Sequence, residues 1–318
     1  MNTWQFIHDK LNASVGVILM YVLHSQGSSP GRQGFTMAVA ADNSFCGSIG
    51  GGIMEHKFVE MAKTLLAENA VVASVYRQQH DKEPGKNKSG MICSGEQTIF
   101  LYPVQQADLI HINALLHSLQ KKENASLILT EKSIQFSNEI PAQNFLFEQK
   151  NETAFLLIEK TGIKNRLVII GGGHCALVLS QLMSSMDFYI ELYEERAGLN
   201  TMDQNIFADE KHIINSYSLL QTLLQPGSNV YVVIMTVGYR TDDIALRALL
   251  NKDFKYIGVL GSKKKMEKLL LVYRQEKMDE NILAKIKTPI GIAINSQTPQ
   301  EIAVSIAAEI IAEKNRYQ

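Results

Sequence analysis

Arg166-Leu-Val-Ile-Ile-Gly-Gly-Gly-His-Cys-Ala176 is the stretch that decides the fold of the second half of this chain. Residues 167–170 are apolar and partly β-branched, which predicts a strand buried on both faces. Gly171, Gly173 and Ala176 fit the pattern G-x-G-x-x-G/A, and leucines at helical spacing follow them. In this pattern the first glycine permits a tight turn, the second lets the backbone approach a phosphate, and the small third residue lets the helix pack on the strand. The stretch therefore predicts a Rossmann-like unit whose helix N-terminus offers N–H groups to an anion.

The residues after this turn continue the pattern of a doubly wound sheet. Strand-like apolar runs alternate with stretches of helical spacing, and residues 230–235 are wholly apolar. Thr298, Pro299 and Glu301 have the spacing of a capping box with proline at the first helical position, which predicts where the last helix begins. The expected strands of this half are residues 167–170, 188–193, 212–214, 230–235 and 256–260.

Ligands of doubly wound sheets bind at the carboxyl ends of the strands, so we expect the residues after these strands to share one crevice. Glu194 follows the second strand, where an acidic residue can accept a hydrogen bond from a ribose 2′-OH; a solvated strand end is the alternative. The lysines at residues 263–265 oppose the dipole of the next helix unless an anion binds there, and a solvated basic turn also stays open. The candidate cofactor-binding residues of this half are Gly171, Gly173, His174, Ala176, Glu194, Thr236, Gly261 and Ser262.

The first half of the chain has two glycine-rich loops. Residues 26–34 combine glycines, a proline and two serines, which indicates a loop with demanding backbone geometry. Residues 50–52 are three glycines that lead directly into a helical pattern, and their entropic cost needs a reason. Either their N–H groups face a phosphate or carbonyl of a ligand, or they form a tight turn with close backbone packing; both interpretations stay open. The candidate cofactor-binding residues here are Gly27, Ser28, Ser29, Gly50, Gly51, Gly52, Glu55 and His56.

The cysteines indicate a reduced, cytoplasmic protein. Cys46, Cys93 and Cys175 are odd in number and widely spaced, so they predict neither a disulfide framework nor a zinc site, and we expect no metal site. Cys93 lies between the polar residues 78–90 and a glycine turn, where a ligand can reach it. Its thiolate is then a candidate nucleophile or a soft contact for metal or sulfur, and the alternative is a small buried residue.

Length and composition set the outer limits of these predictions. A chain of 318 residues that is 46% hydrophobic and 20% charged is globular, and its length suggests about two domains. We expect a smaller mixed α+β domain over residues 1–160 and a Rossmann-like α/β domain over residues 161–318, with residues 135–149 irregular. A net charge of −1 argues against nucleic acid or an anionic membrane as the main partner. No apolar run has the length of a membrane span.

Many of these motifs occur together and in one order along the chain. They are residues 26–34, residues 47–52 with Glu55 and His56, Cys93 with Gly95, residues 171–174, residues 235–236, Asp242, residues 256–262 and residues 298–310. This combination resembles the xanthine dehydrogenase accessory protein family of XdhC/CoxI type over nearly the whole chain. The family often has histidines where this chain has Val237 and Tyr239.

The resemblance implies a function as well as a fold. Members of this family look like non-enzymatic maturation factors that bind molybdenum cofactor, a pterin–dithiolene with a phosphate, and deliver its sulfurated form to a molybdenum hydroxylase apoenzyme. It further implies a cysteine desulfurase as a second partner and a homodimer, and it suggests that Cys93 lies near the metal or its terminal sulfur.

Two other functions remain open at this level. Gly171, Gly173, Ala176 and Glu194 favour an NAD-dependent oxidoreductase, although no Tyr-x-x-x-Lys pair or other hydride-transfer motif is evident. A Rossmann scaffold that only docks a partner protein is the third possibility.

Overall fold

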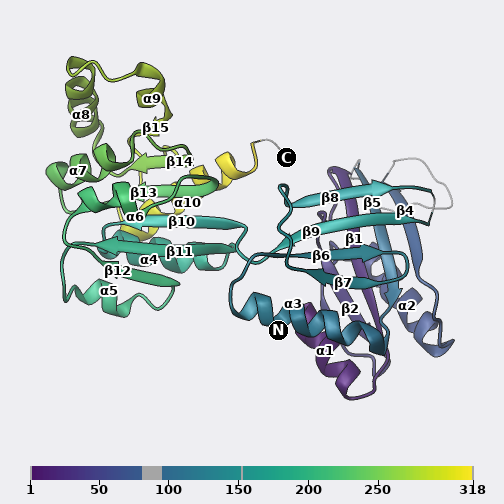
Figure 1. Cartoon of the computed structure of the whole chain (residues 1–318). Helices are drawn as coiled ribbons and strands as arrows, with labels where there is room; N and C mark the ends of the chain where they lie inside the picture. Colours follow the sequence, from purple (N-terminus) through teal and green to yellow (C-terminus); the bar gives the residue numbers. More distant parts are fainter. Residues whose placement is uncertain (1, 81–94, 152, 317–318) are drawn as a thin grey trace. The chain divides into compact units, whose positions relative to one another are not determined.

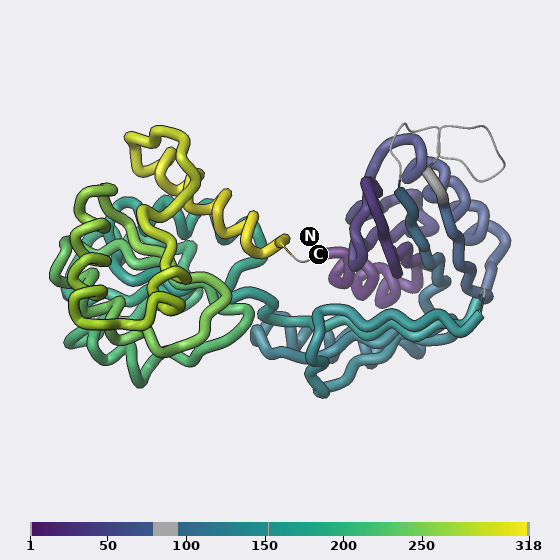
Figure 2. The backbone as a smooth tube through the Cα atoms, turned by 90° about the horizontal axis from the view of Figure 1, so that it is seen from above, coloured from purple at the N-terminus to yellow at the C-terminus, as the bar shows by residue number. Residues whose placement is uncertain are grey.

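The computed structural model describes residues 2–80, 95–151 and 153–316. Backbone contacts divide the chain into two compact units, Met1–Gly162 and Ile163–Gln318. The backbone of each unit can be followed in Figure 1 and, turned by 90°, in Figure 2. The predicted fold class is confirmed, because the first unit contains antiparallel sheets with helices and the second a parallel Rossmann-like sheet. Among the described helices, none combines the length and the apolar composition that a bilayer-spanning segment needs.

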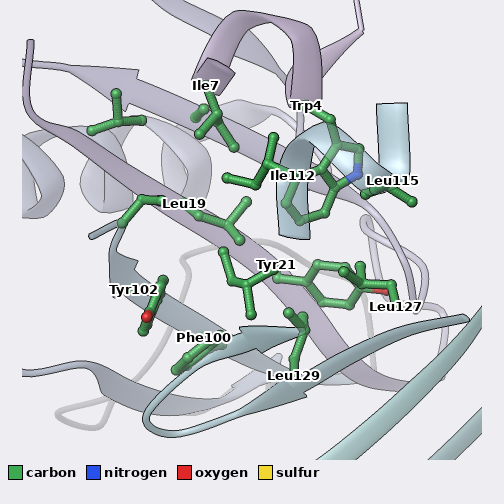
Figure 3. Close-up of a cluster of buried hydrophobic side chains, with 14 of the residues drawn as sticks. Trp4, Ile7, Leu19, Tyr21, Phe100, Tyr102, Ile112, Leu115, Leu127 and Leu129 are labelled. Carbon is green, nitrogen blue, oxygen red and sulfur yellow. The ribbon is translucent and has the colours of Figure 1, made fainter. Parts of the chain in front are cut away.

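A five-stranded antiparallel sheet forms the centre of the first unit. Its central strand β1 (Val17–Gly27) is buried on both faces over its first seven residues. Even-numbered residues such as Met20 pack under helix α2 (Gly52–Ala67), and odd-numbered residues such as Leu19 face helices α1 (Thr3–Asn12) and α3 (Leu109–Gln120). Figure 3 shows this cluster of odd-numbered residues, in which Leu19, Tyr21 and Phe100 belong to the same buried core as Trp4 and Ile7 of α1 and Ile112 and Leu115 of α3. The strand order is β3 (Phe45–Gly47), β2 (Thr36–Ala40), β1, β5 (Gly95–Pro103) and β4 (Ser74–His80).

A second, four-stranded antiparallel sheet closes the same core. Its order is β7 (Ile134–Ser137), β6 (Ala125–Thr130), β9 (Phe155–Thr161) and β8 (Phe145–Gln149). The expectation that residues 135–149 are irregular is therefore wrong at both ends of that segment. Ile134 and Phe136 alternate with polar residues, and Phe145 and Phe147 pack against the core on either side of the exposed Leu146, so each strand has one buried face. Pro141 lies between the two strands, where its missing N–H removes no ladder hydrogen bond.

The second unit is a six-stranded parallel sheet in the order β12-β11-β10-β13-β14-β15. The chain starts in the middle at β10, moves outward through β11 and β12, and then crosses to β13 on the other side. This reversal makes the carboxyl ends of β10 and β13 the switch point at which ligands of such sheets bind. The strands are β10 (Asn165–Ile170), β11 (Phe188–Glu194), β12 (Glu210–Ile213), β13 (Gly227–Ile234), β14 (Phe254–Val259) and β15 (Ile286–Lys287).

Helices cover both faces of this sheet, so the buried parts of the central strands, residues 167–170 and 230–234, carry no charged side chain. Residues 167–170 of β10 are fully buried, as their composition predicts. Thr298 Oγ1 accepts the Glu301 N–H at 3.3 Å and the Glu301 carboxylate accepts the Thr298 N–H at 3.0 Å, which confirms the predicted capping box. One face carries α4 (His174–Ser184), α5 (Asn200–Gln204) and α10 (Pro299–Lys314); the other carries α6 (Leu220–Leu223), α7 (Tyr239–Leu249), α8 (Lys263–Gln275) and α9 (Glu280–Lys285).

Candidate functional site

The glycine loop between β10 and α4 has the geometry that its sequence predicts. Gly171 has φ +106°, and a Cβ there would lie 2.4 Å from the Met235 carbonyl oxygen at the end of β13. Gly173 is the N-cap of α4, with open space around the position of a Cβ. Within the described residues, no side chain caps α4, and His174 in its first turn is exposed. The two glycines therefore have different roles: Gly171 is required by packing, and Gly173 leaves room at a helix N-terminus.

Glu194, at the end of β11, turns its carboxylate into the protein rather than toward solvent. Its Oε2 accepts the Gly172 N–H at 2.7 Å, and its Oε1 accepts the Arg196 N–H at 3.0 Å. The Arg196 guanidinium donates to both oxygens at 2.9 and 2.8 Å. The Tyr217 hydroxyl adds a bond to Oε1 at 3.3 Å, and Glu194 is 1% exposed. The carboxylate predicted to accept a ribose hydroxyl is thus an internal acceptor that holds the glycine loop.

These contacts keep Glu194 ionised. Burial opposes the charged form, but hydrogen bonds from the Arg196 side chain and from the Gly172 and Arg196 N–H groups outweigh it and lower the pKa of Glu194 to about 2. The role of Arg196 was not predicted. The spacing Glu-x-Arg directly after a strand, here Glu194 and Arg196, is the sequence feature that could have indicated this ion pair.

The ends of β13 and β14 bring a second polar group to the same edge of the sheet. The Thr236 N–H and hydroxyl donate to Asp242 Oδ1 at 3.1 and 2.5 Å. Lys265 Nζ lies 3.1 Å from Asp242 Oδ2, and Asp242 is 1% exposed. Ser262 is the N-cap of α8, and its hydroxyl accepts the Lys265 N–H at 3.4 Å. Of the three lysines, Lys265 is therefore ion-paired, a role that sequence reasoning did not assign.

The glycine-rich loops of the first unit pack directly against one another. A Cβ on Gly31 would lie 2.1 Å from the Ile49 carbonyl oxygen, and one on Gly50 would lie 2.5 Å from the Gly31 nitrogen. A Cβ on Gly95 would lie 2.7 Å from the Ser29 nitrogen. Three motifs that are far apart in sequence thus meet at one place, and only glycine fits at these contacts. Gln97, fully buried, donates to the Ile49 carbonyl at 3.2 Å and joins them further.

The Glu55 carboxylate accepts hydrogen bonds from several donors of the second glycine-rich loop. Its Oε2 accepts the Ser48 hydroxyl at 2.6 Å and the N–H groups of Ile49 and Gly51 at 2.8 and 3.0 Å. Burial disfavours the carboxylate, yet these bonds lower the pKa of Glu55 overall. Gly51 is the N-cap of α2, and in the described part of the chain no side chain caps that helix. The helix N-terminus, rather than the N–H groups of residues 49–51, is the part of this loop left for an anion.

The structure thus groups the predicted residues at two places, one in each unit. Gly171, Gly173, His174, Thr236 and Ser262 lie at the carboxyl edge of the parallel sheet, and Gly27–Ser29 and Gly50–Gly52 lie at the loops of the first unit. His56 is exposed in the first turns of α2. Cys93 lies outside the described residues, two positions before Gly95 in sequence. Gly31 and Gln97 were not among the predicted site residues.

One cluster of side chains has the composition of a metal site. Glu191, Glu210 and His212 bring ligand atoms within 4.8 Å of one another on β11 and β12. Arg166 Nη2 lies 2.6 Å from Glu191 Oε1, and the Tyr189 hydroxyl donates to Glu210 at 2.5 Å. The nearby guanidinium supplies the positive charge that a metal would bring, so the cluster is an ion-pair network.

Fold and sites together define a two-unit protein that joins an antiparallel α+β unit to a Rossmann-type unit. The family model for the XdhC and CoxI family matches residues 11–76, and the model for the XdhC Rossmann domain matches residues 167–310. The chain belongs to the XdhC family.

Relatives of known name are distant in sequence. YqeB of Escherichia coli (strain K12), an uncharacterized protein, is 24% identical over 299 residues, which cover 92% of this chain and 43% of YqeB. The chain thus spans less than half the length of that relative. A second relative, from Bacillus subtilis (strain 168), carries the name of a probable xanthine dehydrogenase subunit. It is 21% identical over 320 residues, covering 94% of this chain and 93% of the relative.

A solved structure shares the whole fold. The crystal structure of a xanthine dehydrogenase from Bacillus halodurans matches with a TM-score of 0.73 and 22% identity, covering 100% of this chain and 97% of the other. At this identity the match establishes the fold alone.

Proposed function

We propose that this protein is a maturation factor that binds molybdenum cofactor and delivers it to a xanthine-dehydrogenase-like apoenzyme. Membership of the XdhC family and the name of the Bacillus subtilis relative support an accessory role in xanthine dehydrogenase biology. The strongest structural support for the proposal is the close packing of three sequence motifs of the first unit, at Gly31, Gly50 and Gly95.

The donor groups at this meeting point fit the cofactor that we propose as cargo. The uncapped N-terminus of α2 is suited to a phosphate, since its N–H groups and the helix dipole favour an anion. Glu55 holds the preceding amides, so the loop is ordered before a ligand arrives. At Gly51 nothing lies within 4 Å of the position of a Cβ, so no side chain of that residue stands between the loop and a ligand. The cofactor supplies the molybdenum and its terminal sulfur, and the protein supplies binding and orientation.

Cys93 provides the most direct test of this proposal by substitution. We expect Cys93→Ala to lose most of the molybdenum cofactor that the wild-type protein retains, because a thiolate is a soft ligand for metal or sulfur. The measurement is pterin and molybdenum content after purification from a host that makes the cofactor. Cys46→Ala, the same change in β3, is the matched control and should retain the cofactor. Unchanged retention in Cys93→Ala, with an intact fold by circular dichroism, would remove Cys93 from the site.

The same proposal includes the partner proteins, the cellular location and the oligomeric state. A molybdenum hydroxylase apoenzyme receives the cofactor, a cysteine desulfurase supplies its sulfur, and the factor acts as a cytoplasmic homodimer. Copurification of the apoenzyme with the tagged full-length chain, and its loss when the cofactor is absent, tests the first partnership.

An NAD-dependent oxidoreductase is the second candidate, favoured by the strand order of the parallel sheet and by the Gly171–Gly173 loop. The Glu194 carboxylate weighs against it, because Arg196 already donates to both carboxylate oxygens and a ribose hydroxyl would have to compete with it. Under the leading proposal we expect titration with NAD, NADH or NADPH to give no heat and no change in nicotinamide fluorescence. Micromolar binding of any of them would instead favour the second candidate.

A further inference from the structure

A cavity of about 340 Å³ lies in the second unit, at the amino ends of β14 and β15. Its volume is within the range of ligand-binding cavities. The glycine loop, Thr236 and Ser262 lie at the opposite, carboxyl edge of the same sheet. The cavity therefore belongs to neither of the two candidate sites, and it needs an explanation of its own.

The cavity runs along the outer edge of β14. Residues 254–257 all line it, although consecutive side chains of a strand point to opposite faces of the sheet. It is also lined from both faces, by Leu250 at the end of α7 and by Glu313 of α10. A hollow that meets both faces of a sheet lies at the edge of the strand rather than above it.

Only a short strand covers this edge. On its inner side β14 pairs with β13, and the register includes Phe254 and Tyr256. On its outer side β15 has 2 residues and pairs with Ile257 and Gly258. Among the described strands, none pairs with Phe254 or Tyr256 on the side of the cavity. Such an edge is a template on which an extended peptide can add as a further strand.

The walls offer apolar contacts to the side chains of such a peptide. Leu250 and Ile282 of α9 are half-buried, and both line the cavity together with Ile286 of β15. In an extended peptide every second side chain points to the same face. One apolar side chain of the peptide can therefore pack against these walls while its neighbours reach the polar rim.

The rim of the cavity is basic. Five cationic side chains line it against two carboxylates, those of Asp253 and Glu313. Lys285 Nζ lies 3.1 Å from Asp253 Oδ1, and Arg316 Nη1 lies 3.2 Å from Glu313 Oε2, so each carboxylate already has a cation. Lys287 of β15 is half-buried, and within the described residues it has no ion-pair partner. The excess of positive charge favours an acidic ligand.

We propose that this cavity binds an acidic segment of a partner protein, which adds to the edge of β14 in an extended conformation. Backbone hydrogen bonds to β14 hold the segment, and its carboxylates contact Lys287 and the other cations of the rim. The inference goes beyond the proposed function, because it concerns protein docking at the second unit and requires no cofactor.

The experiment measures the fluorescence anisotropy of a labelled peptide of alternating valine and glutamate, titrated with the full-length protein. We expect saturable binding, and Lys287→Glu should weaken it roughly tenfold or more, because a like charge then faces the carboxylates of the peptide. Ala284→Trp should weaken it as well, since Ala284 lines the cavity at an exposed position of α9 and an indole ring would fill the space.

Two control peptides separate strand addition from attraction of charge alone. Proline in place of each valine keeps the charge but removes N–H groups that pair with the strand edge, so binding should be lost. Lysine in place of each glutamate should also abolish binding. Equal binding of the proline peptide would contradict strand addition, and binding of citrate without binding of the valine–glutamate peptide would identify a site for small anions instead.

Matched variants separate the docking site from general effects of charge and folding. Lys268→Glu makes the same charge reversal at an exposed position of α8 and should leave binding unchanged. Absence of binding at millimolar peptide, or equal affinity of wild type and a folded Lys287→Glu, would overturn the inference. Retention of molybdenum cofactor is a separate measurement, so failure of peptide binding leaves the proposed function intact.

Discussion

Gly171→Ala is expected to destabilise the second unit by about 3 kcal/mol or more. Gly171 has φ +106°, which strains any residue with a side chain, and the new Cβ would lie 2.4 Å from the Met235 carbonyl oxygen. Both atoms belong to central strands or their ends, so neither can move without disturbing the sheet. Calorimetry of the full-length chain measures this effect as a shift in the thermal unfolding temperature of the second unit.

Gly173→Ala is the matched control, because it makes the same change in the same loop. Gly173 has φ −74°, and nothing lies within 4 Å of the position of a Cβ. We expect a loss of stability of about 1 kcal/mol or less, because alanine is a poorer N-cap than glycine but meets no clash here. A destabilisation as large as that of Gly171→Ala would show that the two glycines are not distinguished by packing.

Glu194→Gln is expected to destabilise the second unit by about 3 kcal/mol near neutral pH. The pKa of Glu194 is lowered from 4.5 to about 2, and one pKa unit corresponds to about 1.4 kcal/mol of preference for the folded, ionised state. The variant loses this charge while Arg196 keeps its own, so a buried ion pair loses one partner. Calorimetry at pH 7 measures the resulting decrease in the unfolding temperature. Glu280→Gln, which breaks the exposed pair with Arg274, is the control and should change stability by less than about 1 kcal/mol.

The sign of the pH dependence follows from the same shift. A carboxyl whose folded pKa lies below its unfolded pKa stabilises the protein above the unfolded value, and this contribution is lost as pH falls. Glu194 should therefore contribute fully above about pH 5 and lose its contribution between about pH 5 and pH 2. The difference in unfolding temperature between wild type and Glu194→Gln should shrink over that window. A difference that stays constant from pH 7 to pH 3 would contradict the assignment of the shift to Glu194.

The strands of the second unit were predictable because they are buried on both faces. Residues 167–170 carry no polar side chain, so their burial follows from composition alone. Shorter elements escaped prediction: α5 has 5 residues and β15 has 2, too few for a periodic pattern. In the first unit, β1 extends to Gly27, because a β-bulge between Val22 and His24 lets its polar residues continue the ladder.

The positions of the glycine loops were predictable from the sequence, but the contacts within them were not. Glycine spacing located the loops, since tight turns and close backbone approach require glycine there. The directions of Glu55 and Glu194 could not be read from the sequence, because a carboxylate beside a glycine loop can face either a ligand or the loop. Both turn toward the loop N–H groups, and this contact depends on side chains such as Arg196 that come together only in the folded chain.

The most direct test of the proposed function is the pterin and molybdenum content of the protein purified from a host that makes molybdenum cofactor. Oxidative release of a fluorescent pterin and elemental analysis report the two components separately. We predict nearly one pterin and one molybdenum per chain. Absence of both, under conditions in which a known carrier of the cofactor is loaded, would contradict the proposal and favour the nucleotide-binding alternative.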